Sequence, residues 1–316
     1  MTTGTFAAVT DDLIILDGGR GLELLARTDA PPTQLWSAAV MDADPDLVVE
    51  VHRDYLDAGA DVITINAFSA TRCRLGPRGR ESDYARLQQL ALDLAGRARR
   101  EAGREDDALI AGCLAPYAWA YRPDLAPSFH DLVPGFTETA ALQAPGVDLL
   151  LCETMASARE GAAAAVAAAT TGLPVWMAWT VEDHPTGLLR SGETLREAAE
   201  AITGRGVEPA ALLVNCSVPE AIDAAVGELV ALADELGVPA GAYANGFGPI
   251  IETYSTSSTV EELPRRHDLD PDGHLTWIRR WHAAGLSILG GCCEIGPAHI
   301  RRMTDDLRPG RSGAQG

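Results

Sequence analysis

The chain has 316 residues and a formal net charge of −20, with 47% hydrophobic and 22% charged residues, a balance typical of a globular protein. All 25 basic residues are arginines. The absence of lysine excludes Schiff-base aldolases, pyridoxal-phosphate enzymes and P-loop NTPases. Strong acidity without basic runs argues against nucleic acid and anionic membrane surfaces as partners.

Two segments of the chain bear on targeting and membrane insertion. Residues 1–10 contain no basic residue and no long apolar stretch, so we expect no signal peptide. Residues 161–181 carry no charge, but their threonines and their Gly-Leu-Pro turn predict a helix, a turn and a strand instead of a membrane span. We therefore predict a cytoplasmic protein without a membrane partner. Its six cysteines should be reduced and available for metal binding or catalysis.

Short apolar segments alternate with helical patterns along the whole chain. Each apolar segment has four to six residues, which suits a strand buried on both faces. The eight segments are residues 13–16, 62–65, 109–112, 148–151, 175–179, 211–214, 238–243 and 286–289. The helical patterns are residues 45–58, 83–102, 135–143, 156–170, 194–204, 219–236, 275–284 and 297–307. Residues 116–134 and 246–274 are expected to be long loops.

Eight strands alternating with helices predict the α/β class and, within it, a single-domain (β/α)8 TIM barrel. We assign the barrel to residues 1–307 and a flexible C-terminal tail to residues 308–316. The alternative is a doubly wound open sheet. Residues 17–21 follow the first strand, however, and they lack the G-x-G-x-x-G spacing of a dinucleotide-binding loop.

Three cysteines follow predicted strands at the end where barrel active sites are built. Cys216 comes two residues after the sixth strand, and Cys292 and Cys293 follow the eighth. Three thiolates there could bind zinc and leave a fourth position open, which is the mark of a catalytic site. Adjacent cysteines on a regular strand face opposite sides, so both reach one metal only if the backbone turns, which Gly290 and Gly291 would permit.

Spacing alone leaves another interpretation open, because cysteine is often a small buried hydrophobic residue. For Cys216, Cys292 and Cys293 the two interpretations have equal support. The burial interpretation is favoured for the other three, Cys73, Cys113 and Cys152.

Two carboxylates also follow strongly apolar strands. Asp17 ends the first strand and Glu153 ends the fourth. A carboxylate at such depth needs a partner. Both could bind a cationic ammonium group or act as acid and base. Alternatively, Asp17 forms a turn with the glycines after it, and Glu153 complements the N-terminus of the helix expected from residue 156.

These residues belong to motifs that together resemble the homocysteine S-methyltransferase family, in the right order from about residue 13 to residue 303. The motifs are Asp17-Gly18-Gly19, residues 59–66, Cys152-Glu153-Thr154, Asn215-Cys216 and Gly290-Gly291-Cys292-Cys293. The resemblance implies a (β/α)8 barrel in which three cysteines bind Zn²⁺ and the homocysteine sulfur is the fourth ligand. The implied zinc ligands are Cys216, Cys292 and Cys293.

The resemblance also implies an acceptor site. It places the homocysteine amino group against Glu153 and Asp17, beside Gly18, with Asn66 and Asn215 as polar neighbours of metal and substrate. Where the family usually continues its first motif with a small pair, this chain has Arg20-Gly21. We expect that departure to lie on the donor side.

The implied activity is zinc-dependent transfer of a methyl group from S-methylmethionine or S-adenosylmethionine to the zinc-bound thiolate of L-homocysteine, which gives methionine. One alternative is the same barrel acting on another thiol or a selenol, and another is a demethylase that uses betaine-like osmolytes. A third is a non-catalytic zinc barrel, which would need a fourth protein ligand such as His or Asp near Cys216. The expected partners are small molecules, and the sequence leaves a homo-oligomer open.

Overall fold

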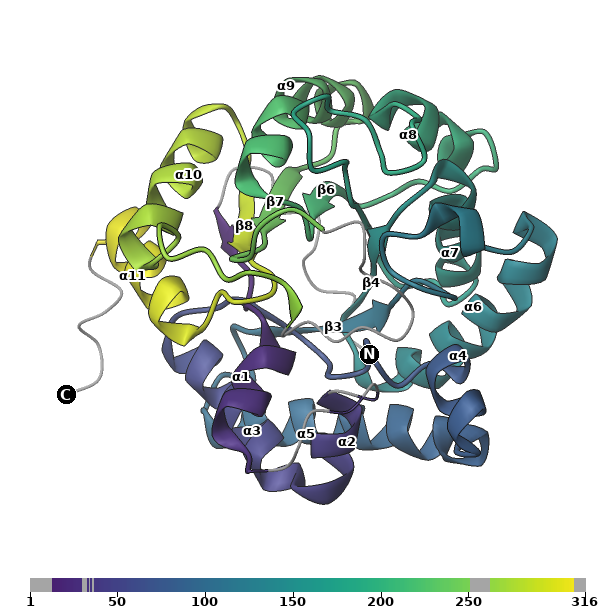
Figure 1. Cartoon of the computed structure of the whole chain (residues 1–316), viewed down its shortest axis with the longest axis vertical. Coiled ribbons are helices and arrows are strands. Elements are labelled where there is room, and N and C mark those ends of the chain that lie inside the picture. Colours follow the sequence, from purple (N-terminus) through teal and green to yellow (C-terminus); the bar gives the residue numbers. More distant parts are fainter. Residues whose placement is uncertain (1–12, 30–32, 34, 36, 251–261, 310–316) are drawn as a thin grey trace.

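The computed structural model describes residues 13–29, 33, 35, 37–250 and 262–309. The first ten residues and the segment 310–316 of the predicted tail lie outside this part of the chain. Eight parallel strands surround a central axis and helices surround the strands (Figure 1), so the predicted (β/α)8 TIM barrel is confirmed. Among the described helices, none is long and apolar enough to cross a membrane.

All eight predicted strands are present, most of them within two residues of the expected bounds. They are β1 (Ile14–Ile15), β2 (Val62–Thr64), β3 (Leu109–Leu114), β4 (Leu149–Met155), β5 (Val175–Trp179), β6 (Ala211–Asn215), β7 (Ala240–Ala244) and β8 (Ile288–Gly291). The hydrogen-bonded order runs β1-β8-β7-β6-β5-β4-β3-β2. A bridge between Leu16 and Val62 joins the two ends of this order and closes the barrel.

The helices form the outer layer of the barrel (Figure 1). They are α1 (Arg20–Arg27), α2 (Ser37–Ala43), α3 (Pro45–Asp57), α4 (Arg72–Leu75), α5 (Tyr84–Glu101), α6 (Phe129–Gln143), α7 (Ala158–Ala169), α8 (Leu195–Thr203), α9 (Pro219–Leu236), α10 (Pro271–Ala283) and α11 (Pro297–Leu307). Short 3₁₀ turns precede α5 and flank α6. The expected loop 246–274 ends at Asp270, which caps α10 by accepting a hydrogen bond from the Gly273 amide.

Two sets of apolar side chains separate along the strands. On β4, Leu149 and Leu151 pack inside the barrel, whereas Leu150 and Cys152 pack outward against the helices. Successive strand residues face opposite sides, so this alternation directs Glu153 inward, toward the carboxyl end of the same strand. The core thus determines which side chains reach the centre of the barrel mouth.

The structure differs from the predicted bounds of several helices and strands. The helices α1, α2 and α4 were not predicted, because four to eight residues are too few for a clear helical period. Helix α6 begins at Phe129 instead of 135, since Ser128 caps it and Pro134 is accommodated inside it. Strand β4 continues to Met155 instead of ending at residue 151, with an irregular register after Cys152.

Candidate functional site

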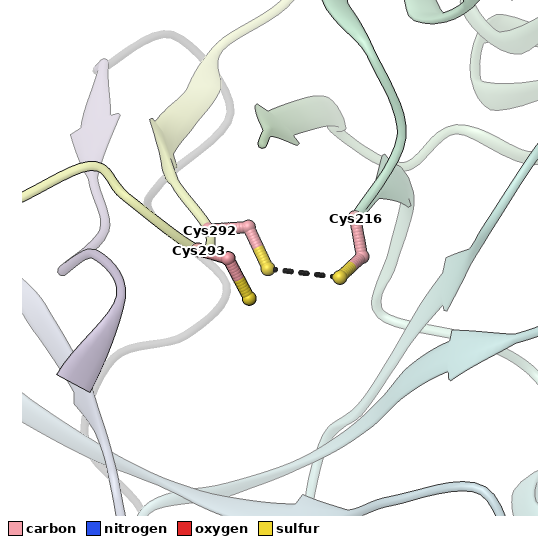
Figure 2. Close-up of side chains that lie close together, drawn as sticks. All are labelled: Cys216, Cys292 and Cys293. Atoms are coloured by element: carbon pink, nitrogen blue, oxygen red, sulfur yellow. Dashed lines mark hydrogen bonds between the residues drawn. The ribbon is translucent and has the colours of Figure 1, made fainter. Parts of the chain in front are cut away.

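Cys216, Cys292 and Cys293 come together at the mouth of the barrel. Their three sulfur atoms all lie within 4.8 Å of one another, and those of Cys216 and Cys292 are 3.2 Å apart. Figure 2 shows the three side chains converging from β6 and from the segment after β8. Residues 76 positions apart in the sequence thus form one cluster of sulfur ligands.

Local backbone conformations bring the cysteines to this point. Cys216 has a left-handed φ of 54°, which is uncommon for a residue with a side chain and breaks the strand alternation after β6. On the other side, Glu294 has a φ of 66°, so the chain turns sharply just after Cys293. The amides of Cys216 and Cys292 donate to carbonyls of the β7 segment, at 3.1 and 2.8 Å, which ties both cysteines to one strand.

The glycines before Cys292 have a different role from the expected one. Gly290 and Gly291 do not adopt a positive φ, so they do not supply the turn. Instead they allow close approach: a Cβ on Gly290 would lie 2.6 Å from the Leu16 Cβ, and one on Gly291 would lie 2.1 Å from the Ile295 side chain. The glycines therefore let β1 and the residues after Cys293 pack tightly around the cluster.

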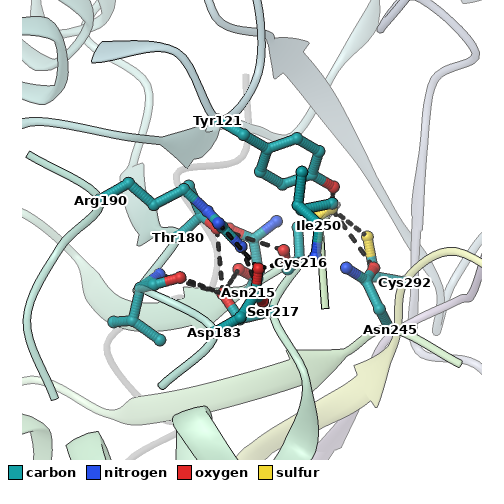
Figure 3. Close-up of polar contacts among 11 residues, drawn as sticks. Tyr121, Thr180, Asp183, Arg190, Asn215, Cys216, Ser217, Asn245, Ile250 and Cys292 are labelled. Atoms are coloured by element: carbon teal, nitrogen blue, oxygen red, sulfur yellow. Dashed lines mark hydrogen bonds and ion pairs between the residues drawn. The ribbon is translucent and has the colours of Figure 1, made fainter. Parts of the chain in front are cut away.

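Polar groups surround Cys216 (Figure 3). The Tyr121 hydroxyl lies 2.9 Å from its sulfur and the Asn245 Oδ1 lies 3.4 Å from it. Asn245 Nδ2 is buried and makes no hydrogen bond with the described residues. Turning this amide over would present an N–H donor to a Cys216 thiolate. The guanidinium of Arg190 stacks 4.6 Å from the centre of the Tyr121 ring and so packs against its face.

The three thiols cannot all ionise without compensation. Hydrogen bonds from Cys292 and Cys293 lower the pKa of the Cys216 thiol well below its ordinary value. The contact with Cys216 raises the pKa of Cys292 and Cys293 well above theirs. Among the three thiols, Cys216 is thus the one whose surroundings most favour the thiolate form.

The cluster has the composition of a metal site. Its ligand atoms are three sulfurs, which soft or borderline metals such as zinc prefer. The Asn245 Nδ2 makes no hydrogen bond with the described residues, and it fits a neighbouring thiolate, the form in which Cys216 would bind a metal. Within the described part of the chain, no histidine or carboxylate joins the three cysteines. The fourth ligand that a closed structural site would need is thus not found among these residues.

Asp17 and Glu153 line the same pocket as the cysteines. Asp17 Oδ2 accepts a hydrogen bond from the Thr64 amide at 2.9 Å and pairs with Arg20 Nη1 at 2.6 Å. Glu153 Oε1 accepts a hydrogen bond from the Cys113 thiol at 2.9 Å. Cys113 therefore has a polar contact that the burial interpretation did not include.

Arg20 compensates part of this acidic charge. Burial raises the pKa of both Asp17 and Glu153, and the nearby positive charge of Arg20 opposes the rise in each case. The Arg20 side chain is only 11% exposed. The sequence placed Arg20 on the donor side, whereas the structure pairs it with Asp17, a residue assigned to the acceptor.

The alternative role of Glu153 as a partner of the following helix is not supported. Helix α7 begins at Ala158, and Ser157 caps it by accepting a hydrogen bond from the Glu160 amide at 3.2 Å. Glu160 also supplies the acidic charge of its first turn. Glu153 instead lies on β4 and faces the pocket.

The remaining candidate residues divide into lining and supporting groups. Gly18 and Asn66 line the pocket, and the Asn66 amide donates to the Ser37 carbonyl at 3.2 Å. Asn215 is fully buried and does not belong to the lining. Its amide binds the backbone and hydroxyl of Thr154 at 3.0 and 2.9 Å, which holds that residue in a left-handed conformation with φ of 62°. Asn215 therefore fixes the backbone beside Glu153.

A single pocket joins the cysteine cluster to the carboxylates. Its wall also includes residues that the sequence did not single out as site residues, among them Arg20, Tyr121 and Phe247. Arg20 departs from the usual continuation of the first motif, and this departure is a signal that the sequence offers for it. Tyr121 and Phe247 lie in expected loops, where no periodic pattern indicates which side chains turn inward.

A (β/α)8 barrel with an open three-cysteine cluster at the carboxyl ends of its strands defines a class of metal-dependent enzyme in which a substrate completes the metal's ligands. The family model described as homocysteine S-methyltransferase matches residues 14–307. This chain belongs to that family.

Individual relatives agree. The Escherichia coli K12 homocysteine S-methyltransferase is 31% identical, over 92% of this chain and 94% of that protein. Homocysteine S-methyltransferase 4 of maize (Zea mays) is 29% identical, over 93% of this chain and 89% of that protein. The metallated crystal form of the E. coli homocysteine methyltransferase MmuM has a TM-score of 0.76 and 28% identity, and the match covers 94% of this chain and 96% of that one.

Proposed function

We propose that this protein transfers a methyl group from a cationic donor, S-methylmethionine or S-adenosylmethionine, to the sulfur of L-homocysteine, with Zn²⁺ held by three cysteines. The observation that carries this proposal is the cluster of three sulfurs within 4.8 Å in a pocket that also contains two buried carboxylates. The proposed metal ligands are Cys216, Cys292 and Cys293.

The reaction needs a nucleophilic sulfur. A free thiol has a pKa near about 8.5, so only a few per cent is ionised at neutral pH. Zn²⁺, when bound, would supply the positive charge that lowers this pKa and orients the acceptor sulfur. Cys216, Cys292 and Cys293 would hold it with three negative charges, which leaves the site net anionic and keeps the acceptor sulfur electron-rich.

The bond changes are those of an in-line displacement. The homocysteine sulfur forms a bond to the methyl carbon while the bond from that carbon to the donor's positive sulfur breaks. The electron pair of the broken bond stays on the donor sulfur, which becomes a neutral thioether. The homocysteine thiol has lost its proton on binding, so the transfer itself needs no general base. An anionic pocket favours the approach of the cationic donor.

The protein's residues orient the acceptor. Glu153 Oε2 makes no hydrogen bond with the described residues, and we assign it to the homocysteine ammonium group. The Asn215 amide, through Thr154, keeps the end of β4 in the conformation that directs this carboxylate inward. Tyr121 and Asn245 fix the position of the Cys216 sulfur.

The decisive experiment combines metal analysis with turnover. We expect about one zinc per chain in freshly reduced protein, and methionine formation from homocysteine with S-methylmethionine or S-adenosylmethionine. Betaine should serve as the comparison donor, because a preference for it would favour the osmolyte alternative. Zinc binding without turnover with any of these donors would contradict the proposal and favour a non-catalytic barrel.

A further inference from the structure

Arg20 is a charged side chain whose role in the pocket the proposed chemistry leaves unexplained. It is the first residue of α1, it lines the pocket, and its side chain is only 11% exposed. Placing a guanidinium at such depth is costly unless its N–H groups find acceptors. The ion pair with Asp17 satisfies part of this requirement, and the rest needs another partner.

The hydrogen bonds of Arg20 are incomplete. A guanidinium has five N–H donors. Within the described residues, its side-chain bond is the one from Nη1 to Asp17 Oδ2 at 2.6 Å. Nε is buried without a partner, and Nη2 makes no hydrogen bond there but is not fully buried. A planar fork with an unoccupied terminal nitrogen in a pocket is suited to a carboxylate.

Other arginines near the pocket already interact with protein groups. The Arg74 guanidinium, which also lines the pocket, stacks 4.4 Å from the centre of the Trp119 ring. Arg190 makes two hydrogen bonds to the Asp183 carboxylate, at 3.0 and 2.9 Å. Arg20 is therefore the cation best placed to meet an anionic group beside Glu153.

We propose that Arg20 binds the carboxylate of the acceptor while Glu153 binds its ammonium group, so that the pocket selects a zwitterionic amino-acid thiol. Asp17 then acts mainly as the internal counter-ion that holds the guanidinium in place. This assignment rests on the proposed function and refines its acceptor class. It also separates the two carboxylates, which the sequence had treated as equivalent partners of the ammonium group.

Three thiols of nearly equal length test the assignment. Homocysteine carries both charged groups, 3-aminopropane-1-thiol lacks the carboxylate, and 4-mercaptobutanoate lacks the ammonium group. The zinc-loaded protein is assayed with each thiol and S-methylmethionine. We expect Arg20→Met to lower kcat/KM for homocysteine by about 10- to 100-fold, mainly through KM, because it removes a hydrogen bond to a charged group. For 3-aminopropane-1-thiol, kcat/KM should change by less than about threefold.

A second variant and a control keep the test independent of folding. Arg20→Lys retains the positive charge beside Asp17 but removes the fork, so it should fold and still lose part of the preference for homocysteine over 3-aminopropane-1-thiol. Arg27→Met alters an exposed arginine on the same helix, which pairs with Glu23 and Asp54, and should leave that preference unchanged.

Two results would overturn the inference. An equal loss with homocysteine and 3-aminopropane-1-thiol would mean that Arg20 only supports the structure. A gain with homocysteine in Arg20→Met, with a wild-type preference for 4-mercaptobutanoate, would mean that Arg20 occupies the ammonium position. Calorimetric titration of the three thiols into zinc-loaded protein without donor measures the same preference. It therefore tests Arg20 even if methyl transfer itself is not observed.

Discussion

The two ends of the pocket differ in whether a protein cation compensates their acidic groups. At one end, Cys216, Cys292 and Cys293 gather three ionisable sulfurs with no protein cation bonded to them among the described residues. At the other end, Asp17 is already paired with Arg20 at 2.6 Å. The three cysteines thus require an added cation to become fully ionised. The carboxylate end already contains a cation, the guanidinium of Arg20.

This contrast has a physical basis in geometry. Three sulfurs within 4.8 Å leave room for one small ion coordinated by all of them. The carboxylates come from different parts of the barrel wall, and Arg20 pairs with Asp17 while its charge also opposes the rise in the pKa of Glu153. The first arrangement is suited to binding a metal, and the second to distinguishing the charged groups of a substrate.

Removing a ligand at the cysteine end should have the largest effect. The Cys216→Ala and Cys293→Ala variants should each lose most of the bound zinc, and their activity should be lower by more than about 100-fold. Removal of a group that only supports a metal ligand already lowers metal affinity or activity by about 10- to 100-fold. The fold should change little, because the barrel has its own core. Metal analysis and turnover measure this. Cys73→Ala is the matched control, and unchanged zinc in both ligand variants would refute the site.

Oxidation tests the same end without mutation. The Cys216 and Cys292 sulfurs are 3.2 Å apart, so peroxide can join them as a disulfide while it is reduced to water. We expect loss of zinc and activity together, and recovery of both after treatment with a thiol reductant and zinc. Zinc release from oxidised protein that remains fully active would be incompatible with the proposal.

At the carboxylate end, Glu153→Gln should weaken homocysteine binding by about 10- to 100-fold, because the ammonium group loses a charge-assisted hydrogen bond. Zinc content and melting temperature should barely change. The measurement is KM for homocysteine together with a zinc assay. As a control, 4-mercaptobutanoate lacks the ammonium group and should react equally poorly with both proteins. An unchanged KM with a lower melting temperature would indicate a purely structural carboxylate.

Glu160 extends the comparison between compensated and uncompensated acidic groups. It is a buried carboxyl that forms no ion pair with the described residues. Burial raises its pKa to about 7, although the Tyr117 amide donates to it. The folded state therefore holds this proton more tightly than the unfolded state, and stability should fall as the pH rises from about 4.5 to about 7. Glu160→Gln should remove this loss, so it should stabilise the protein at pH 8 relative to pH 5 by on the order of 1 kcal/mol.

Thermal unfolding at the two pH values measures the effect of Glu160→Gln. The matched control is Glu138→Gln, since the hydrogen bond from Arg72 lowers the pKa of Glu138. That variant should lose a small amount of stability at pH 8. Equal behaviour of the two variants would show that burial does not perturb Glu160 in solution.

Local sequence patterns predicted most of the barrel. The bounds of α9 and α11 agree with the sequence at both ends, because proline begins each helix and leaves a clear signal. The eight strands were detectable because parallel strands buried on both faces are continuous apolar segments. The short helices α1, α2 and α4 were missed, since their sequences are too short to show a period.

What the sequence by itself determined was the set of chemically distinctive residues, including Cys216, Cys292, Cys293 and Glu153, and their order along alternating strands and helices. Only the tertiary structure decided which of their charges are already compensated. The ion pair of Arg20 with Asp17, the approach of Tyr121 to Cys216 over 95 positions and the position of Asn245 all depend on strand closure and loop paths. Those contacts join residues far apart in the chain, and no local propensity encodes them.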